Sequence, residues 1–187
     1  MANEYRLSAS DEPPCAGRRA WAAMYAAAWA CTLGTAVMVT VAGGAAQKIS
    51  RSVLGLSLHP AAARGGLLDV LALAAHNTPI AAWPLLLTTA GAHRGPRLRL
   101  AADTAVVACL LVNTVPVGAA LGAYGPPVVA FLPQLPLEWA ALAVGYASWL
   151  QQRHTPLPRR QRVTRLVVIA GLLAGAAVLE TYAVPRP

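Results

Sequence analysis

The sequence predicts an all-α fold, a polytopic bundle of about five transmembrane helices. Of its 187 residues, 57% are hydrophobic and only 12% are charged, and the mean hydropathy is +0.51. A soluble domain of this size has too much surface to be so apolar. Because about 20 apolar residues cross a bilayer core, we place the spans at residues 21–46, 66–91, 100–122, 137–152 and 163–184.

The positive charges predict the orientation of these spans, since short cytoplasmic loops retain Arg and Lys during insertion. The inner side then holds Arg6, Arg18, Arg19, Arg94, Arg97, Arg99, Arg153, Arg159, Arg160, Arg162 and Arg165, and the outer side holds Lys48, Arg51, Arg64 and Arg186. We therefore predict a multi-pass protein of the inner (plasma) membrane. Residues 1–20 would be a cytoplasmic tail and residues 21–187 a single transmembrane domain. The excess of Arg in this Ala-rich chain is typical of a GC-rich genome rather than of a surface that binds nucleic acid. We therefore expect no nucleic-acid partner.

The connection after the first span predicts a short helix lying in the outer interface. Apolar residues recur in it next to two positive charges, a pattern typical of helices that lie on a bilayer. The apolar residues are Ile49, Val53, Leu54, Leu56 and Leu58, and the charges are Lys48 and Arg51.

The second and third spans each carry a polar stretch with a proline about midway, "HNTP" at 76–79 and "VNTVP" at 112–116. Proline removes a backbone donor and clashes with the preceding turn, so we predict that both spans are interrupted or kinked there. Consecutive spans run in opposite directions, so the two breaks would meet at similar depth if these helices packed side by side.

Two interpretations of these stretches stay open. Asn77, Thr78, Asn113 and Thr114 could satisfy the backbone carbonyls that the prolines leave unpaired, because such breaks survive only where protein or water covers them. Alternatively, they could frame a polar site for a substrate or an ion, as the broken helices of transporters do.

Four carboxylates fall within the predicted spans, where each costs several kcal/mol unless it is paired, protonated or hydrated. They are Asp69, Asp103, Glu138 and Glu180. Arg99 lies one helical turn before Asp103, and we predict that these two residues form an ion pair.

The other three carboxylates lie at comparable height on the outer side. Asp69 shares a helix face with His76, so a path for protons or cations could run from Asp69, Glu138 and Glu180 down to His76. The alternative is that outer arginines neutralise these carboxylates; the candidates are Arg51, Arg64 and Arg186.

The sequence contains no recognised catalytic motif. Cys15, Cys31 and Cys109 form no spaced pair, and we predict neither a metal site nor a cofactor. Gly118 and Gly122 have the small-xxx-small spacing that lets membrane helices approach closely.

The order of polar residues over positions 66–152 resembles the stage II sporulation protein M family of bacterial integral membrane proteins. That pattern has an Asn in the middle span, an Asn-Gly followed by a Gly, and then Leu-Pro-His-Gly-x-x-Glu opening the next helix. The matching residues are Asn77, Asn113, Gly118, Leu132, Pro133 and Glu138. Gln134 and Leu135 stand where the family has His and Gly, and Thr114 replaces a glycine.

The resemblance implies a protein that works with a partner in the membrane, as family members do with cell-wall hydrolases or in bacteriocin secretion and immunity. We therefore expect a partner or transport subunit for a peptide or an envelope component. A second hypothesis is an intramembrane enzyme, or a subunit of one, that modifies a peptide or lipid, with His76 and a carboxylate, Asp69 or Glu138, as acid and base. A third is a structural scaffold.

Overall fold

All regular secondary structure in the described part of the chain is helical, which confirms the predicted all-α class. The computed structural model describes residues 14–54, 66–87, 89–153 and 156–183. The α-helices are α1 (Pro14–Ala42), α2 (Gly44–Leu54), α3 (Leu67–Ala82), α4 (Pro96–Tyr124), α5 (Leu135–Gln152) and α6 (Arg159–Ala183). Short 3-10 helices are η1 (Trp83–Leu86), η2 (Ala92–Arg94) and η3 (Pro126–Phe131).

Three of the helices, α1, α4 and α6, are long and apolar enough to cross a membrane. The stretches with this length and composition are Gly17–Ala42, Pro96–Tyr124 and Arg159–Ala183. Most of their residues lie on the surface of the bundle, whereas a surface helix of a soluble protein buries its apolar stripe. The outward apolar surface is therefore suited to lipid, in agreement with the composition.

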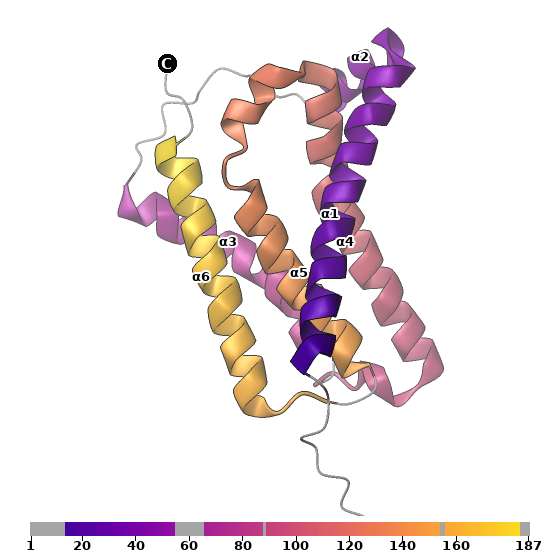
Figure 1. Cartoon of the computed structure of the whole chain (residues 1–187), viewed down its shortest axis with the longest axis vertical. Coiled ribbons are helices and arrows are strands. Elements are labelled where there is room, and N and C mark those ends of the chain that lie inside the picture. The colour runs from indigo at the N-terminus through magenta and orange to yellow at the C-terminus, as the bar shows by residue number, and fades with distance from the viewer. Residues whose placement is uncertain (1–13, 55–65, 88, 154–155, 184–187) are drawn as a thin grey trace, which may run out of the picture.

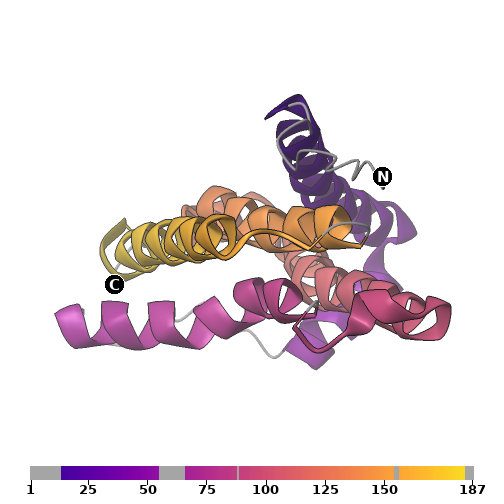
Figure 2. The same cartoon turned by 90° about the horizontal axis from the view of Figure 1, so that it is seen from below.

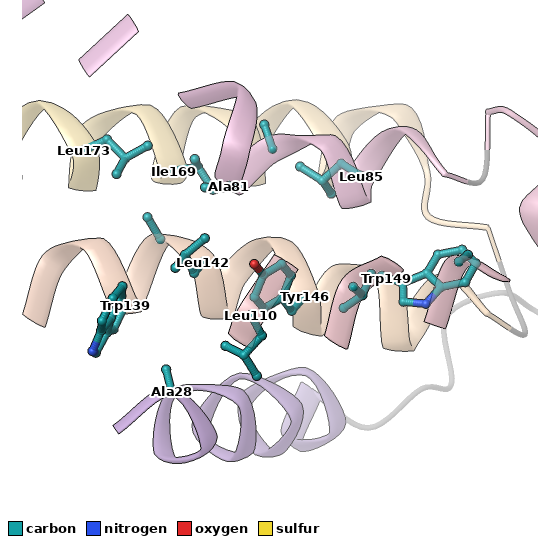
Figure 3. Packing of buried hydrophobic residues seen from close by; sticks show 14 of the residues in the cluster. Ala28, Ala81, Leu85, Leu110, Trp139, Leu142, Tyr146, Trp149, Ile169 and Leu173 are labelled. Atoms are coloured by element: carbon teal, nitrogen blue, oxygen red, sulfur yellow. The ribbon is translucent and has the colours of Figure 1, made fainter. Parts of the chain in front are cut away.

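Helix α5 lies at the centre of the bundle, between α1 on one side and α6 and α3 on the other (Figure 1). Its side chains supply the largest part of the core (Figure 3). From α5 come Trp139, Leu142, Tyr146 and Trp149; they pack with Ala28 of α1, Ala81 and Leu85 of α3 and η1, and Ile169 and Leu173 of α6.

The helix directions bring most of the positive charge to one end of the molecule. Helices α1, α4 and α6 begin at the end where α5 finishes (Figure 1). The described arginines at this arginine-rich end are Arg18, Arg19, Arg94, Arg97, Arg99, Arg153, Arg159, Arg160, Arg162 and Arg165. At the opposite end, the positive side chains of the described residues are Lys48 and Arg51 of α2.

Two glycines set the contact between α4 and α1. A Cβ added to Gly118 would lie 2.2 Å from the carbonyl oxygen of Thr32, and one added to Gly122 would lie 2.5 Å from that of Ala36. Only glycine allows the backbones this close. The predicted small-xxx-small contact is confirmed, and its partner is α1.

A third glycine, Gly145 of α5, allows close contact with the end of α3. The α-helix changes to η1 at Trp83, whose N–H donates to the carbonyl of Pro79, and Pro84 then occupies the first turn of η1. This corner packs onto α5 at Gly145, where an added Cβ would lie only 1.9 Å from the carbonyl oxygen of Ala81. Helix α3 runs obliquely past α6 to the centre of the bundle (Figure 1).

Several predicted boundaries differ from the observed ones. Helix α3 ends at Ala82 rather than at residue 91, because Pro84 cannot continue it. Helix α4 runs without interruption through Pro116 to Tyr124, so the third span has no break in its helix. Helices α1 and α6 begin earlier than predicted, at Pro14 and Arg159, since both extend beyond the apolar stretch into the arginine-rich end. Residues 1–13 of the predicted tail lie outside the described residues.

Replacing Gly145 by Ala is expected to destabilise the protein. The new Cβ would collide with the Ala81 carbonyl, and overpacking of this kind costs about 1–3 kcal/mol. The measurement is the midpoint of thermal unfolding of the purified protein in detergent micelles.

Gly171→Ala provides the matched control, because no heavy atom lies within 4 Å of the Cβ it would add to α6. This change is expected to leave the midpoint unchanged or to raise it, since Ala is the better helix former. Equal midpoints for the two variants would contradict the close contact between α3 and α5.

Candidate functional site

The polar residues predicted in the middle of the second and third spans mostly bond within their own helices. Thr78 Oγ1 donates to the carbonyl of Ala74 at 2.7 Å, and Thr114 Oγ1 donates to that of Leu110 at 2.8 Å. Asn113 Nδ2 donates to the carbonyl of Cys109 at 2.7 Å. These contacts favour the interpretation that the polar side chains satisfy the backbone.

The helices that carry the two polar stretches are not packed along each other in the described structure. Helix α3 packs against α6 and α5, while α4 packs against α1 and α2. Viewed along the bundle, α3 extends away from α4 (Figure 2). Asn77 and Asn113 are thus not brought together by side-by-side packing of the second and third spans.

The three carboxylates predicted at the outer side have different surroundings. Asp69 lies exposed in the first turn of α3, where its Oδ2 accepts the backbone N–H of Gly66 at 3.1 Å and so caps the helix. Glu138 of α5 and Glu180 of α6 are half-buried and close enough for their charges to interact. Arg51 binds a backbone carbonyl instead of these groups, and Arg64 and Arg186 lie outside the described residues.

His76 lies on the face of α3 that no other described helix covers. The exposed residues of this face recur at helical spacing, and we call them the α3 outer face: Leu68, Leu71, Ala72, Ala75, His76 and Pro79. Asn77 and Thr78 are half-buried at its edge. Among the six residues of the α3 outer face, His76 alone has a polar side chain.

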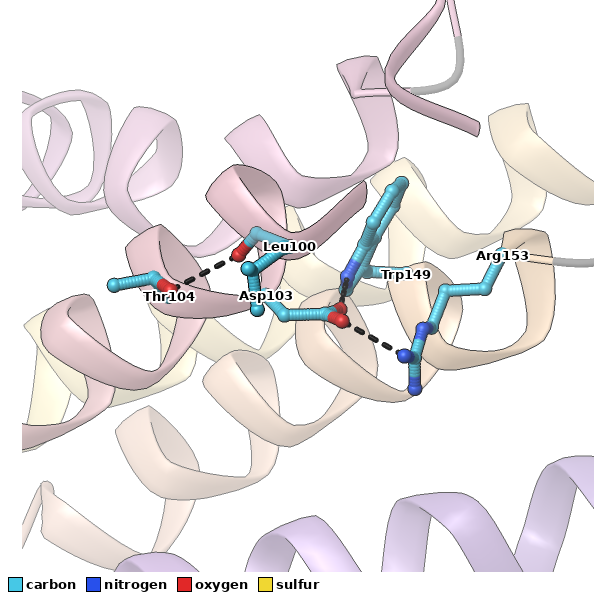
Figure 4. A network of polar contacts seen from close by, with 5 residues as sticks. All are labelled: Leu100, Asp103, Thr104, Trp149 and Arg153. Carbon is cyan, nitrogen blue, oxygen red and sulfur yellow. Dashed lines mark hydrogen bonds and ion pairs between the residues drawn. The ribbon is translucent and has the colours of Figure 1, made fainter. Parts of the chain in front are cut away.

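The ion pair of Asp103 was predicted wrongly. Asp103 Oδ2 accepts from Arg153 Nη2 at 2.7 Å, and Oδ1 accepts from Trp149 Nε1 at 2.8 Å (Figure 4). Trp149 lies in the last turn of α5 and Arg153 directly follows that helix, so the carboxylate joins α4 to the end of α5. Local spacing favoured Arg99, but the crossing of the two helices brings Arg153 to the carboxylate.

A second polar contact at the arginine-rich end joins α5 to α6. Arg165 Nη1 donates to Ser148 Oγ at 2.9 Å, and Arg165 Nη2 donates to Gln151 Oε1. Ser148 is fully buried. Arg165 was predicted at the same end as the other inner arginines, but its partners were not predictable, because a Ser and a Gln in an apolar helix give no distinctive sequence signal.

The metal-ligating side chains among the described residues are scattered over the bundle. No three His, Cys, Asp or Glu side chains among them are close enough together to hold a metal ion. Deeper in the bundle, the Tyr146 hydroxyl of α5 is buried near the Cys109 thiol of α4 and has no hydrogen-bond partner among the described residues. The polar contacts at the arginine-rich end join helices, whereas Asn113 and Thr114 bond within α4. The α3 outer face with His76 is therefore the best candidate for a functional surface.

A double-mutant cycle is expected to assign the partner of Asp103. Asp103→Asn and Arg153→Gln should show a coupling free energy of at least about 0.5 kcal/mol, as residues of one ion-pair network do. Asp103→Asn and Arg99→Gln should show coupling near zero. Unfolding in mixed detergent micelles measures both cycles, and stronger coupling to Arg99 would contradict the observed geometry.

Comparison with known protein families, with curated proteins and with solved structures finds no match to this chain.

Proposed function

We propose that the protein crosses the inner membrane five times and acts as a partner or transport subunit for a peptide or an envelope component. In this proposal α5 and the oblique α3, which continues into η1 at Trp83, complete the set of spans begun by α1, α4 and α6. The arginine-rich end faces the cytoplasm, since short inner segments retain positive charge. The nature of the cargo rests on the resemblance over residues 66–152.

The observation that carries the partner role is the exposure of His76. The residues around it on the α3 outer face are apolar and suited to hydrocarbon. An imidazole facing lipid is costly, because polar and ionisable groups in a membrane almost always face protein or water. A second protein surface that covers the α3 outer face and bonds to His76 would remove this cost.

The position of α3 in the bundle also supports this role. Its buried side is fixed by the contact of Ala81 with Gly145 and by packing against α6. Its outer face is therefore presented on a rigid support rather than on a loop, and a preorganised face loses less entropy on binding.

Site-specific photo-crosslinking in native membranes tests the proposal. A benzophenone amino acid replaces Ala75, which is exposed next to His76, or Val167, which is exposed on the apolar surface of α6. We expect a discrete protein adduct from position 75 and only lipid adducts from position 167. His76→Leu should weaken the adduct at position 75, because it removes the polar contact with the partner.

The mass of the adduct identifies the partner as a second copy of this chain or as a different protein. Absence of a protein adduct at position 75, or the same adducts at both positions, would overturn the partner role.

A further inference from the structure

A groove at the end opposite the arginine-rich end has features of a binding site. The chain turns at Gly43, which has a φ of +73°, so that α2 folds back onto the end of α4. Gln47 and Arg51, one turn apart on α2, face this end and line the groove. The remaining wall is built by Thr40 of α1, the last turn of α4 and η3.

Arg51 is held in the wall of the groove by backbone and aromatic contacts. Its Nε and Nη2 donate to the carbonyl of Ala123 at 3.0 and 2.6 Å, which places a positive charge at the negative end of the α4 dipole. The guanidinium carbon lies 5.4 Å from the centre of the Tyr124 ring. These contacts occupy one edge of the guanidinium, and its Nη1 has no hydrogen-bond partner among the described residues.

The groove is large enough for a small ligand and has a mixed lining. Its volume is about 570 Å³, and its polar lining comes from Thr40, Gln47, Arg51 and Tyr124. Leu121, Pro126 and Val129 supply an apolar part. Binding pockets for small molecules commonly span about 300–1,000 Å³ and combine an apolar lining with a few polar groups.

The location of the groove indicates what could fill it. It lies where the membrane-length helices α1 and α4 both end, which is the level of the lipid head groups. Ile49 and Val53 of α2 are exposed and apolar, so α2 is suited to lie in the interface, as the sequence analysis predicts. Glu138 and Glu180 do not line the groove, and its single described charge is therefore the positive one of Arg51.

We infer that this groove binds the phosphodiester head group of an anionic phospholipid. The free edge of Arg51 donates to a phosphate oxygen, and the Gln47 amide is placed to bond to hydroxyl groups of the head group. Leu121 and Val129 accommodate the first carbons of an acyl chain. A choline head group fits less well, because its ammonium would lie near the guanidinium. The inference requires only that α1 and α4 cross the membrane and does not depend on the partner role.

Native mass spectrometry of the full chain tests this inference. The protein is released from micelles that contain equal amounts of phosphatidylglycerol and phosphatidylcholine. We expect phosphatidylglycerol adducts to exceed phosphatidylcholine adducts about tenfold, or about 1.4 kcal/mol. Both lipids offer the phosphate, but choline brings an ammonium close to Arg51 and has no hydroxyl groups for Gln47. Arg51→Gln should abolish the preference, whereas Lys48→Gln, which removes an equal charge from the same helix outside the groove, should keep it.

A second pair of variants separates loss of the site from loss of the fold, because Arg51 also stabilises the end of α4. Val129→Trp is expected to fill the groove and to abolish the preference without altering any charge. Ala130→Trp changes the adjacent exposed residue, which does not line the groove, and should keep the preference. Equal binding of both lipids, or an equal loss in Lys48→Gln and Arg51→Gln, would overturn the inference. Competition by millimolar inorganic phosphate would show a free-phosphate site instead of a lipid site.

Discussion

Hydrogen bonds from a side chain to the carbonyl four residues earlier allow polar residues to exist in the apolar middle of this bundle. Thr32, Thr78 and Thr114 all donate in this way, and Thr32 and Thr114 are fully buried. In hydrocarbon an unsatisfied polar group costs several kcal/mol, so a side chain that bonds to its own helix needs no neighbour. The packing of the helices then depends mainly on how closely their surfaces fit together.

Small residues determine where the helices of this bundle come into close contact. Gly118 and Gly122 admit the backbone of α1, and Gly145 admits the end of α3. Without a hydrophobic driving force between helices in lipid, such close van der Waals contact is the main source of association. Specific polar pairs, such as Asp103 with Arg153, also fix which helices are neighbours, and they lie at the arginine-rich end rather than in the middle of the bundle.

The sequence was sufficient to predict what depends on composition and local spacing. The all-α class, the approximate helix positions and the glycine contact of α4 belong to this group. The placement of α3 was not predictable, because it depends on a glycine of α5 more than sixty residues away in the chain. The partner of Asp103 was missed for the same reason, since an Arg one turn away on the same helix looks sufficient until the crossing of α4 and α5 is known.

Between Asp103 and Arg153 the chain leaves the arginine-rich end along α4 and returns to it along α5. During synthesis the carboxylate therefore emerges fifty residues before the guanidinium that neutralises it. Until α5 has been made, this carboxylate lacks both of the side chains that bond to it in the folded protein, Trp149 and Arg153. The contact that fixes the start of α4 can therefore form only after the whole of α5 has been synthesised.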